Sequence, residues 1–283
     1  MTIDLHTHSA VSDGTDSPAD LVAAAARAGL TVLALCDHDT FDGLADAAAA
    51  ARGSTVRLLP GIEISARLGG DSVHLLGYGC RTADPALTAE LARIREGRRR
   101  RVPAMLAALA RLGMPLELSE VARFAGDSPS VGRPHVADAL VARGYVADRN
   151  QAFARYLADD GPAYVSRYAT EVATGIDLVH RAGGVAVIAH PWGRGGERQI
   201  TESLLAGLVG RHGLDGIEVD HNDHTPAQRR SLRVLADRLG LLVTGSSDYH
   251  GLGKLNHPLG CHTTAPAVLG EIERRIDLFG GSR

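Results

Sequence analysis

Histidine and carboxylate residues of the types that bind metal ions recur in short groups along this sequence. The first group is His6-Thr7-His8, followed closely by Asp13. Alternate side chains of an extended segment point to the same side, so both imidazoles can bind a single ion. An isolated His-x-His pair is common in ordinary loops. The further groups downstream favour a metal site here.

Those further groups lie on or just after short apolar runs that we predict to be strands. They comprise Asp37-His38-Asp39, Glu63, His74, His190 and Asp248-Tyr249-His250. Mixed imidazole and carboxylate ligands suit Zn²⁺, Mn²⁺ or Fe²⁺ better than Mg²⁺ or Ca²⁺. The groups are too numerous for one ion, and without cations many of them would be badly desolvated or would repel one another. We therefore predict two to three divalent metal ions.

Seven nearly continuous apolar runs are typical of buried parallel strands. They cover residues 3–6, 31–36, 56–64, 72–77, 185–189, 216–219 and 241–244. Between them lie segments with helical spacing of apolar residues, at 17–28, 42–52, 171–182, 202–212 and 226–239. This alternation predicts an α/β protein, a (β/α) barrel of seven strands, with an open doubly wound sheet as the alternative. Active sites of such barrels form at the C-terminal strand ends, where the histidines are found.

The alternation breaks between residues 85 and 168, which contain no clear strand. Helical patterns there cover residues 87–112, 119–125, 134–143 and 150–157. We predict a barrel formed by residues 1–84 and 169–283, with a helical insertion over residues 85–168 that caps the active site. The arginine run at residues 98–101 is expected on the solvated surface of the first of these helices.

The composition excludes several function classes. The formal net charge of −3 provides no general attraction to long nucleic acid or to an anionic membrane. No signal peptide and no apolar stretch of about 18 residues is present. We expect a cytoplasmic protein acting on a small molecule, and the sequence leaves its oligomeric state open.

The sequence resembles the PHP (polymerase and histidinol phosphatase) superfamily. The matching blocks, in family order, are residues 4–9, 13–15, 36–40, 60–65, 74–78, 189–191 and 247–251. The resemblance implies a distorted seven-stranded (β/α) barrel, metal-dependent phosphoester hydrolysis and three metal ions. The first ion would be held by His6, His8, Glu63 and Asp248, the second by Glu63, His74 and His190, and the third by Asp13, His38 and His250. Asp37 and Asp39 would orient His38 or neighbouring imidazoles.

Within the superfamily, the insertion with Val131-Gly132-Arg133-Pro134-His135 resembles that of nucleoside 3′,5′-bisphosphate phosphatases. The resemblance implies that Arg133 and His135 contact a substrate phosphate, because a guanidinium matches phosphate with two parallel hydrogen bonds. Part of the segment 218–224, which follows the sixth predicted strand, should face the site. His221 or His224 could protonate the leaving group or have a structural hydrogen-bonding role, and His224 is a further candidate for contacting the substrate. Asp248, His250, Arg133 and His135 are the residues we expect to take part in catalysis.

The favoured activity is hydrolysis of a nucleoside 3′,5′-bisphosphate to a nucleoside 5′-monophosphate and phosphate. Three alternatives remain open: a 5′-3′ exonuclease acting on short RNA or DNA, a histidinol-phosphate phosphatase, and an inactive scaffold stabilised by metal. Residues able to bind metal occupy all nine ligand positions, which disfavours the scaffold.

Overall fold

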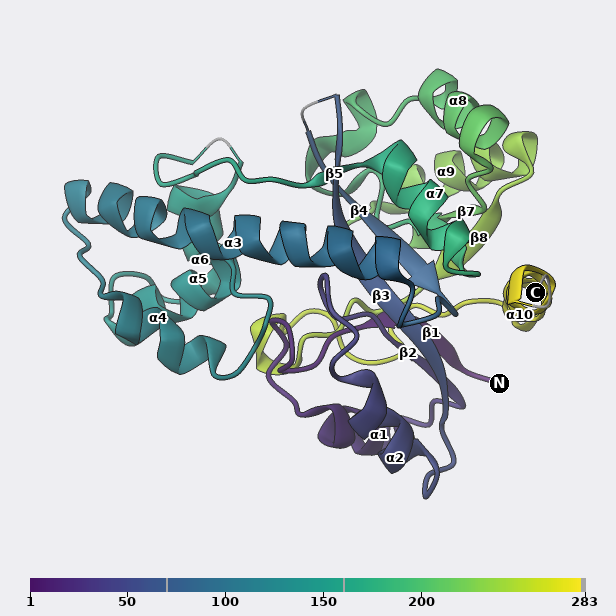
Figure 1. The fold of residues 1–283 in the computed structure, drawn as a ribbon, viewed down its shortest axis with the longest axis horizontal. Coiled ribbons are helices and arrows are strands. Elements are labelled where there is room, and N and C mark those ends of the chain that lie inside the picture. The colour runs from purple at the N-terminus through teal and green to yellow at the C-terminus, as the bar shows by residue number, and fades with distance from the viewer. Residues whose placement is uncertain (70, 160, 281–283) are drawn as a thin grey trace.

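The computed structural model describes residues 1–69, 71–159 and 161–280, and its centre is a strongly curved sheet (Figure 1). Seven strands are hydrogen-bonded in the order β1-β2-β3-β4-β6-β7-β8. They are β1 (Ile3–Thr7), β2 (Val32–Leu35), β3 (Arg57–Leu68), β4 (Asp71–Tyr78), β6 (Val185–Ile188), β7 (Gly216–Asp220) and β8 (Leu242–Gly245). An additional short strand, β5 (Thr170–Glu171), pairs with β3.

The sheet is nearly closed into a barrel. The first strand meets the segment after β8, where Thr7 and Tyr249 form a parallel bridge and the backbone N–H of His8 donates to the carbonyl of Tyr249 at 2.9 Å. The predicted barrel-like fold of seven strands is therefore confirmed, and the open doubly wound sheet is not formed.

The expectation of parallel strands is wrong for β4, which runs antiparallel to both β3 and β6. The chain leaves β3 at Leu68 and enters β4 at Asp71. So short a connection can join antiparallel strands but not parallel ones. In the resulting register Ser65 lies opposite His74. His74 therefore reaches the interior from the middle of a strand and not from a C-terminal strand end.

Helices cover the outside of the sheet, and they begin and end close to the predicted positions. They are α1 (Pro18–Arg27), α2 (Leu44–Ala51), α7 (Val172–Arg181), α8 (Glu202–His212) and α9 (Pro226–Leu239). The last helix, α10 (Pro266–Gly280), was not predicted. Local signals define the ends: the Ser17 side chain accepts from the backbone N–H of Asp20 at the start of α1, and Gly240 ends α9 with φ +65°.

The segment between β4 and β5 is helical, as predicted. It comprises α3 (Pro85–Arg111), α4 (Leu118–Ala125), α5 (Arg133–Ala142), α6 (Arg149–Ala152) and a π-helical turn at Phe153–Leu157. Residues such as Met105, Leu109, Val136 and Leu140 form a separate apolar core in this region. Figure 1 shows α4, α5 and α6 on the side of the sheet away from both termini. In the part of the chain that the structure describes, no helix is both long and apolar enough to cross a membrane.

Candidate metal centre

The nine predicted metal ligands come together in one connected cluster inside the barrel, with the carboxylate of Glu63 at its centre. Glu63 is 1% exposed. Five imidazole nitrogens lie within 3.4 Å of its oxygens: Nδ1 of His74 (2.8 Å) and Nε2 of His190 (3.3 Å) from Oε1, and Nδ1 of His38 (3.0 Å), Nε2 of His8 (3.2 Å) and Nε2 of His6 (3.4 Å) from Oε2.

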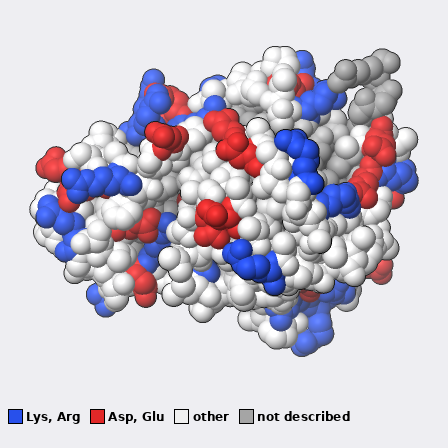
Figure 2. All heavy atoms as spheres, turned by 90° about the horizontal axis from the view of Figure 1, so that it is seen from below, with Lys and Arg blue, Asp and Glu red and all other residues white. Residues whose placement is uncertain are grey.

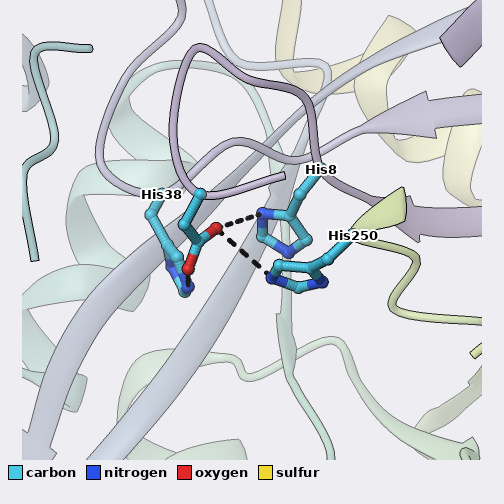
Figure 3. A group of neighbouring side chains, drawn as sticks. His8, His38 and His250 are labelled. Carbon is cyan, nitrogen blue, oxygen red and sulfur yellow. Dashed lines mark ion pairs between the residues drawn. The ribbon is translucent and has the colours of Figure 1, made fainter. Parts of the chain in front are cut away.

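Asp13 organises a second part of the cluster. Its Oδ1 lies 3.3 Å from His250 Nε2 and 3.7 Å from His8 Nδ1, and its Oδ2 lies 3.6 Å from His38 Nε2. Figure 3 shows the rings of His8, His38 and His250 gathered around this carboxylate. Asp248 completes the set, because its Oδ1 lies 3.3 Å from His8 Nε2 and 3.4 Å from His250 Nδ1.

Unusual backbone conformations place several of these side chains. Within the described ranges, the non-glycine residues with positive φ are Asp39 (58°), His190 (27°) and Asp248 (53°). They follow β2, β6 and β8, respectively. Such conformations cost about 1–3 kcal/mol each and persist where the surrounding structure enforces them. His190 and Asp248 are predicted ligands and Asp39 follows the ligand His38, so the strained positions all lie at strand ends that carry the cluster.

The protonation equilibria of the cluster are strongly shifted. Burial alone would lower the pKa of His8, but hydrogen bonds to Asp248 and Glu63 raise it to about 9. Burial lowers the pKa of His74 to about 3, and burial together with the neighbouring His8 lowers the pKa of His250 to about 4. Although burial opposes the ionised form of Glu63, the charges of the surrounding histidines hold its pKa well below the usual value.

These contacts fit a group of metal ligands better than a set of hydrogen bonds. The Nε2 atoms of His6 and His8 face each other at 3.0 Å. The Nδ1 atoms of His38 and His74 are buried and lack a hydrogen-bond partner among the described residues, although each points at a Glu63 oxygen. Ligand atoms of His8, Asp13, His38 and His250 all lie within 4.8 Å of one another, as do those of His6, His8 and Asp248. Facing lone pairs and carboxylates are compatible with divalent cations between them.

The two carboxylates beside His38 accept hydrogen bonds from serine and arginine residues. Asp37 accepts hydrogen bonds from the backbone N–H and hydroxyl of Ser9 (2.8 and 2.7 Å), and Asp39 accepts from the backbone N–H of Ser65 (2.7 Å) and from Arg98 Nε (2.7 Å). In the described ranges neither carboxylate hydrogen-bonds an imidazole. Within that part of the chain they therefore contact no histidine ring themselves, and they fix the loops on either side of His38.

Glu218 is the carboxylate that orients a predicted ligand, a role that the sequence prediction did not assign to it. It is fully buried on β7, its Oε1 lies 3.2 Å from His6 Nδ1, and its Oε2 accepts from the backbone N–H of His190 at 2.9 Å. A carboxylate on the second ring nitrogen fixes the ring and leaves Nε2 of His6 available as a ligand. The only signal was its place in an apolar strand, two residues after Gly216.

Two more residues contact Asp248, and one of them, Lys254, was not predicted. Lys254, the only lysine in the sequence, forms an ion pair with Asp248 Oδ2. His221 Nδ1 accepts from the backbone N–H of Asp223 at 3.0 Å, which leaves its Nε2 protonated to donate to Asp248 Oδ2 at 3.3 Å. Lys254 belongs to no recognisable local motif, and His221 has the structural hydrogen bonds that were one of the two roles considered for it.

The three predicted substrate contacts lie outside the metal cluster. Arg133 donates to the carbonyl of Leu157 at 3.0 Å, and His135 Nδ1 accepts from the backbone N–H of Gly132 at 3.1 Å. Both ring nitrogens of His224 have backbone partners, the carbonyl of Val219 (2.8 Å) and the N–H of Trp192 (3.1 Å). The role of all three in binding substrate stays a prediction.

The insertion contacts two of the loops that carry predicted ligands, the loop after β1 with Asp13 and the loop after β2 with His38. The Ser128 hydroxyl donates to the carbonyl of Val11 (2.8 Å), Arg149 donates to the carbonyl of Asp13 (3.0 Å), and Arg95 donates to the carbonyl of Asp39 (2.7 Å). The expected solvated surface at residues 98–101 is only half correct, because Arg98 and Arg101 are buried at 4% and 5% exposure. They lie on the side of α3 that faces the barrel and the rest of the insertion.

Comparison with known proteins agrees with this geometry. Residues 4–115 match the family model of the PHP domain. The chain is similar to a 3′,5′-nucleoside bisphosphate phosphatase of Chromobacterium violaceum, with 36% identity over 97% of this chain and 96% of that protein. It is also similar to a 5′-3′ exoribonuclease of Haemophilus influenzae, with 35% identity over 87% of this chain and 89% of that protein.

A solved structure from Bifidobacterium adolescentis, assigned as a metal-dependent phosphoesterase, has the same fold. Its TM-score is 0.91 at 35% identity, and the match covers 96% of each chain. The likeness spans the barrel and the helical insertion together, so the fold described above is shared as a whole.

Proposed function

The chain belongs to the PHP family and is a metal-dependent phosphoesterase, and we propose that it removes one phosphate from a small nucleotide. The first candidate substrate is a nucleoside 3′,5′-bisphosphate, which would yield a nucleoside 5′-monophosphate and phosphate. The observation that carries this proposal is the convergence of five imidazoles on Glu63 inside a chain that is similar over almost its whole length to a nucleoside bisphosphate phosphatase.

The cluster is large enough for two to three divalent ions, with Mn²⁺, Zn²⁺ or Fe²⁺ as the candidates. The residues that would hold them are the nine named above: His6, His8, Asp13, His38, Glu63, His74, His190, Asp248 and His250. Such ions would activate water for attack and neutralise the charge that develops on the phosphoryl group. Glu218 and His221 would keep His6 and Asp248 in the orientation that binding requires.

The helical insertion would enclose the substrate and supply contacts to its phosphates. His135 is buried at the start of α5, and the charge of Asp13 affects its pKa, so it lies close to the metal cluster. Burial lowers the pKa of His135, which favours a neutral ring near neutral pH. Because His135 Nδ1 already accepts from the backbone, a neutral His135 would donate one hydrogen bond from Nε2 to the substrate, and Arg133 would provide positive charge for a substrate phosphate.

The surface charge agrees with a small substrate. On the face shown in Figure 2, basic and acidic side chains are interspersed, without a continuous basic band of the type that tracks a nucleic acid backbone. A cytoplasmic location stays a prediction from the sequence.

The test is phosphate release by Mn²⁺-reconstituted protein from adenosine 3′,5′-bisphosphate, 3′-AMP, 5′-AMP, histidinol phosphate and a short 5′-phosphorylated RNA. Asp248→Ala is the control for contaminating phosphatases, because Asp248 contacts three of the ligand histidines. We expect rapid release from the bisphosphate, with at least 100-fold less in the control. Turnover of the RNA alone would replace the proposal with an exonuclease, and turnover of no substrate by metal-loaded protein would refute it.

A further inference from the structure

Four arginines gather beside the metal cluster, and we propose that they form a subsite for the phosphate of the substrate that is not cleaved. The four are Arg98 and Arg101 of α3, Arg133 of α5, and Arg167 of the segment before β5. The proposal deepens the proposed function, on which it rests, because it assigns the second phosphate of a nucleoside bisphosphate to a defined place.

The arginines are close neighbours in space although they come from three segments. Arg101 and Arg167 line the same cavity, of about 690 Å³, between α3 and residues 165–168. A Cβ atom added to Gly132 would lie 2.9 Å from Arg98 Nη1. The backbone just before α5 is therefore packed closely against the Arg98 guanidinium. The Arg133 guanidinium lies 5.6 Å from the centre of the Tyr164 ring.

Among the described residues, the four arginines have fewer carboxylate partners than positive charges. Arg98 pairs with Asp39 at 2.7 Å, and Arg133 pairs with the half-exposed Asp159. Within the ranges that the structure describes, Arg101 and Arg167 have no ion pair, and the buried Nε of Arg101 has no hydrogen-bond partner. The remaining contact of Arg101 is a long one, 3.5 Å from its Nη1 to the carbonyl of Val165.

Burial and the neighbouring Arg167, Arg133 and Arg98 lower the pKa of Arg101 to about 8. A guanidinium nevertheless stays protonated in proteins. The free-energy cost of burying Arg101 beside other positive charges is therefore relieved by binding an anion and not by losing a proton. A phosphate monoester dianion has the charge and the oxygen geometry that several arginines bind together.

The position relative to the metal cluster fits a substrate with two phosphates. Arg98 donates from Nη2 to the hydroxyl of Ser65 at 2.6 Å, and Ser65 lies directly opposite His74 in the β3–β4 register. Arg98 also binds Asp39, the residue after His38. A ligand in the arginine cluster would therefore be adjacent to the histidines, with one phosphate among the arginines and the other among the metals.

The first test is binding of adenosine 5′-monophosphate, which retains the uncleaved phosphate, to metal-free protein by calorimetry. Adenosine is the ligand control. Arg101→Met keeps the apolar stem, Arg167→Met is the second variant, and Arg99→Met is the matched control because Arg99 is 74% exposed on the same helix. We expect each test variant to weaken binding about 10- to 100-fold, the range for losing a charge-assisted hydrogen bond. Equal affinity of wild type and Arg101→Met would refute the subsite.

Thermal unfolding without ligand separates binding from a structural role. If Arg101 serves the ligand, Arg101→Met should unfold at the same or a higher temperature than wild type, because a repulsive charge is gone. A lower unfolding temperature together with unchanged affinity would mean a structural role. A 5′-phosphorylated dinucleotide carries the same phosphate, and its affinity relative to adenosine 5′-monophosphate identifies whether a mononucleotide or a chain end is the source.

Turnover provides the second test. The ratio of kcat/KM for adenosine 3′,5′-bisphosphate to kcat/KM for 3′-AMP should fall about 10- to 100-fold in Arg101→Met and stay constant in Arg99→Met. An unchanged ratio would contradict the subsite. If the protein hydrolyses neither compound but its binding of adenosine 5′-monophosphate depends on Arg101, the proposed function fails while the subsite stands.

Discussion

The buried ion pair between Asp39 and Arg98 should be worth more to stability than any other single contact near the site. Asp39 is fully buried, Arg98 is 4% exposed, and the Asp39 carboxylate accepts from Arg98 Nε and from the backbone and hydroxyl of Ser65. Removing one partner from such a pair leaves an uncompensated buried charge and costs about 3–5 kcal/mol. Asp39→Asn and Arg98→Met should therefore both destabilise the protein strongly.

The loss of stability should be larger for Asp39→Asn than for Arg98→Met. Asp39→Asn leaves Arg98 unpaired beside Arg101 and Arg167, so its cost should lie near the upper end of that range. Arg98→Met removes one of these mutually repelling charges, and Asp39 keeps its bonds to Ser65, so its cost should lie near the lower end. In the double variant the two effects should not add, and the coupling free energy should be about 2 kcal/mol or more.

Urea unfolding of metal-free protein, followed by circular dichroism, gives the four free energies of unfolding needed for this cycle. Arg99→Met should change the stability by less than about 0.5 kcal/mol, because its pair with Glu96 is on the surface. The reasoning is wrong if Arg98→Met costs more than Asp39→Asn, or if the two costs add to within about 0.5 kcal/mol.

Three further predictions concern the metals, their supporting carboxylate and the pH dependence of stability. Chelation should abolish activity and lower the unfolding temperature in calorimetry, with recovery of both on adding Mn²⁺, because ions that bind only the folded state stabilise it; an unchanged unfolding temperature would contradict a metal site. Glu218→Gln should weaken metal affinity about 10- to 100-fold in equilibrium dialysis, because it changes the partner of His6 Nδ1; wild-type affinity would show that this contact is not needed. Burial opposes ionisation of Asp215, but hydrogen bonds from His180, Ala186 and Arg275 outweigh this effect and lower the pKa of Asp215. The ionised carboxylate therefore stabilises the folded protein above about pH 4, and this stabilisation is lost as the pH falls further. Asp215→Asn should cost about 1–3 kcal/mol at pH 7 and progressively less below pH 4 in urea titrations, whereas a cost independent of pH would contradict the assigned charge.

The parts of the fold and site that could be predicted from the sequence are those with local signals. Each ligand group follows or lies within an apolar run, and the direction of the chain places the ends of parallel strands at one edge. The helix ends could also be predicted from local sequence, because Ser17 caps the start of α1 and Gly240 ends α9. These signals sufficed to predict the seven strands, the helical insertion and a wider group of candidate ligands, and the resemblance to the PHP superfamily reduced that group to nine residues.

Features that depend on contacts between distant segments were not predicted. The direction of β4 was also missed, although the two glycines at residues 69 and 70 are a local signal for a hairpin between antiparallel strands. Lys254 and His221 reach Asp248 only because the loops after β7 and β8 pack together. For Glu218, a carboxylate in an apolar strand does not reveal that its partner, His6, lies more than 200 residues away.

The buried arginines of α3 did have a signal in the sequence. The buried apolar residues of α3 include Leu87, Leu91, Ile94 and Met105, at spacings of four, three and eleven residues. The gap of eleven residues is filled by Arg98 and Arg101, which lie on the same side of the helix. A run of four arginines suggests a solvated surface, but the helical period places two of the four on the apolar face. Periodicity is thus the better guide than local composition, because burial in a helix is set by direction around its axis.

Asp39 connects the metal cluster to the arginine cluster, and two separate requirements determine its residue type. Its backbone has φ +58°, and its N–H donates to the carbonyl of Glu63 at 3.0 Å, which holds the preceding His38 beside that carboxylate. Glycine or asparagine would tolerate this conformation but would leave Arg98 without a negative partner. Glutamate would supply the charge, but its longer side chain is not suited to the left-handed backbone or to the bonds with Ser65. Aspartate satisfies both requirements, so the position of His38 and the neutralisation of Arg98 depend on one side chain.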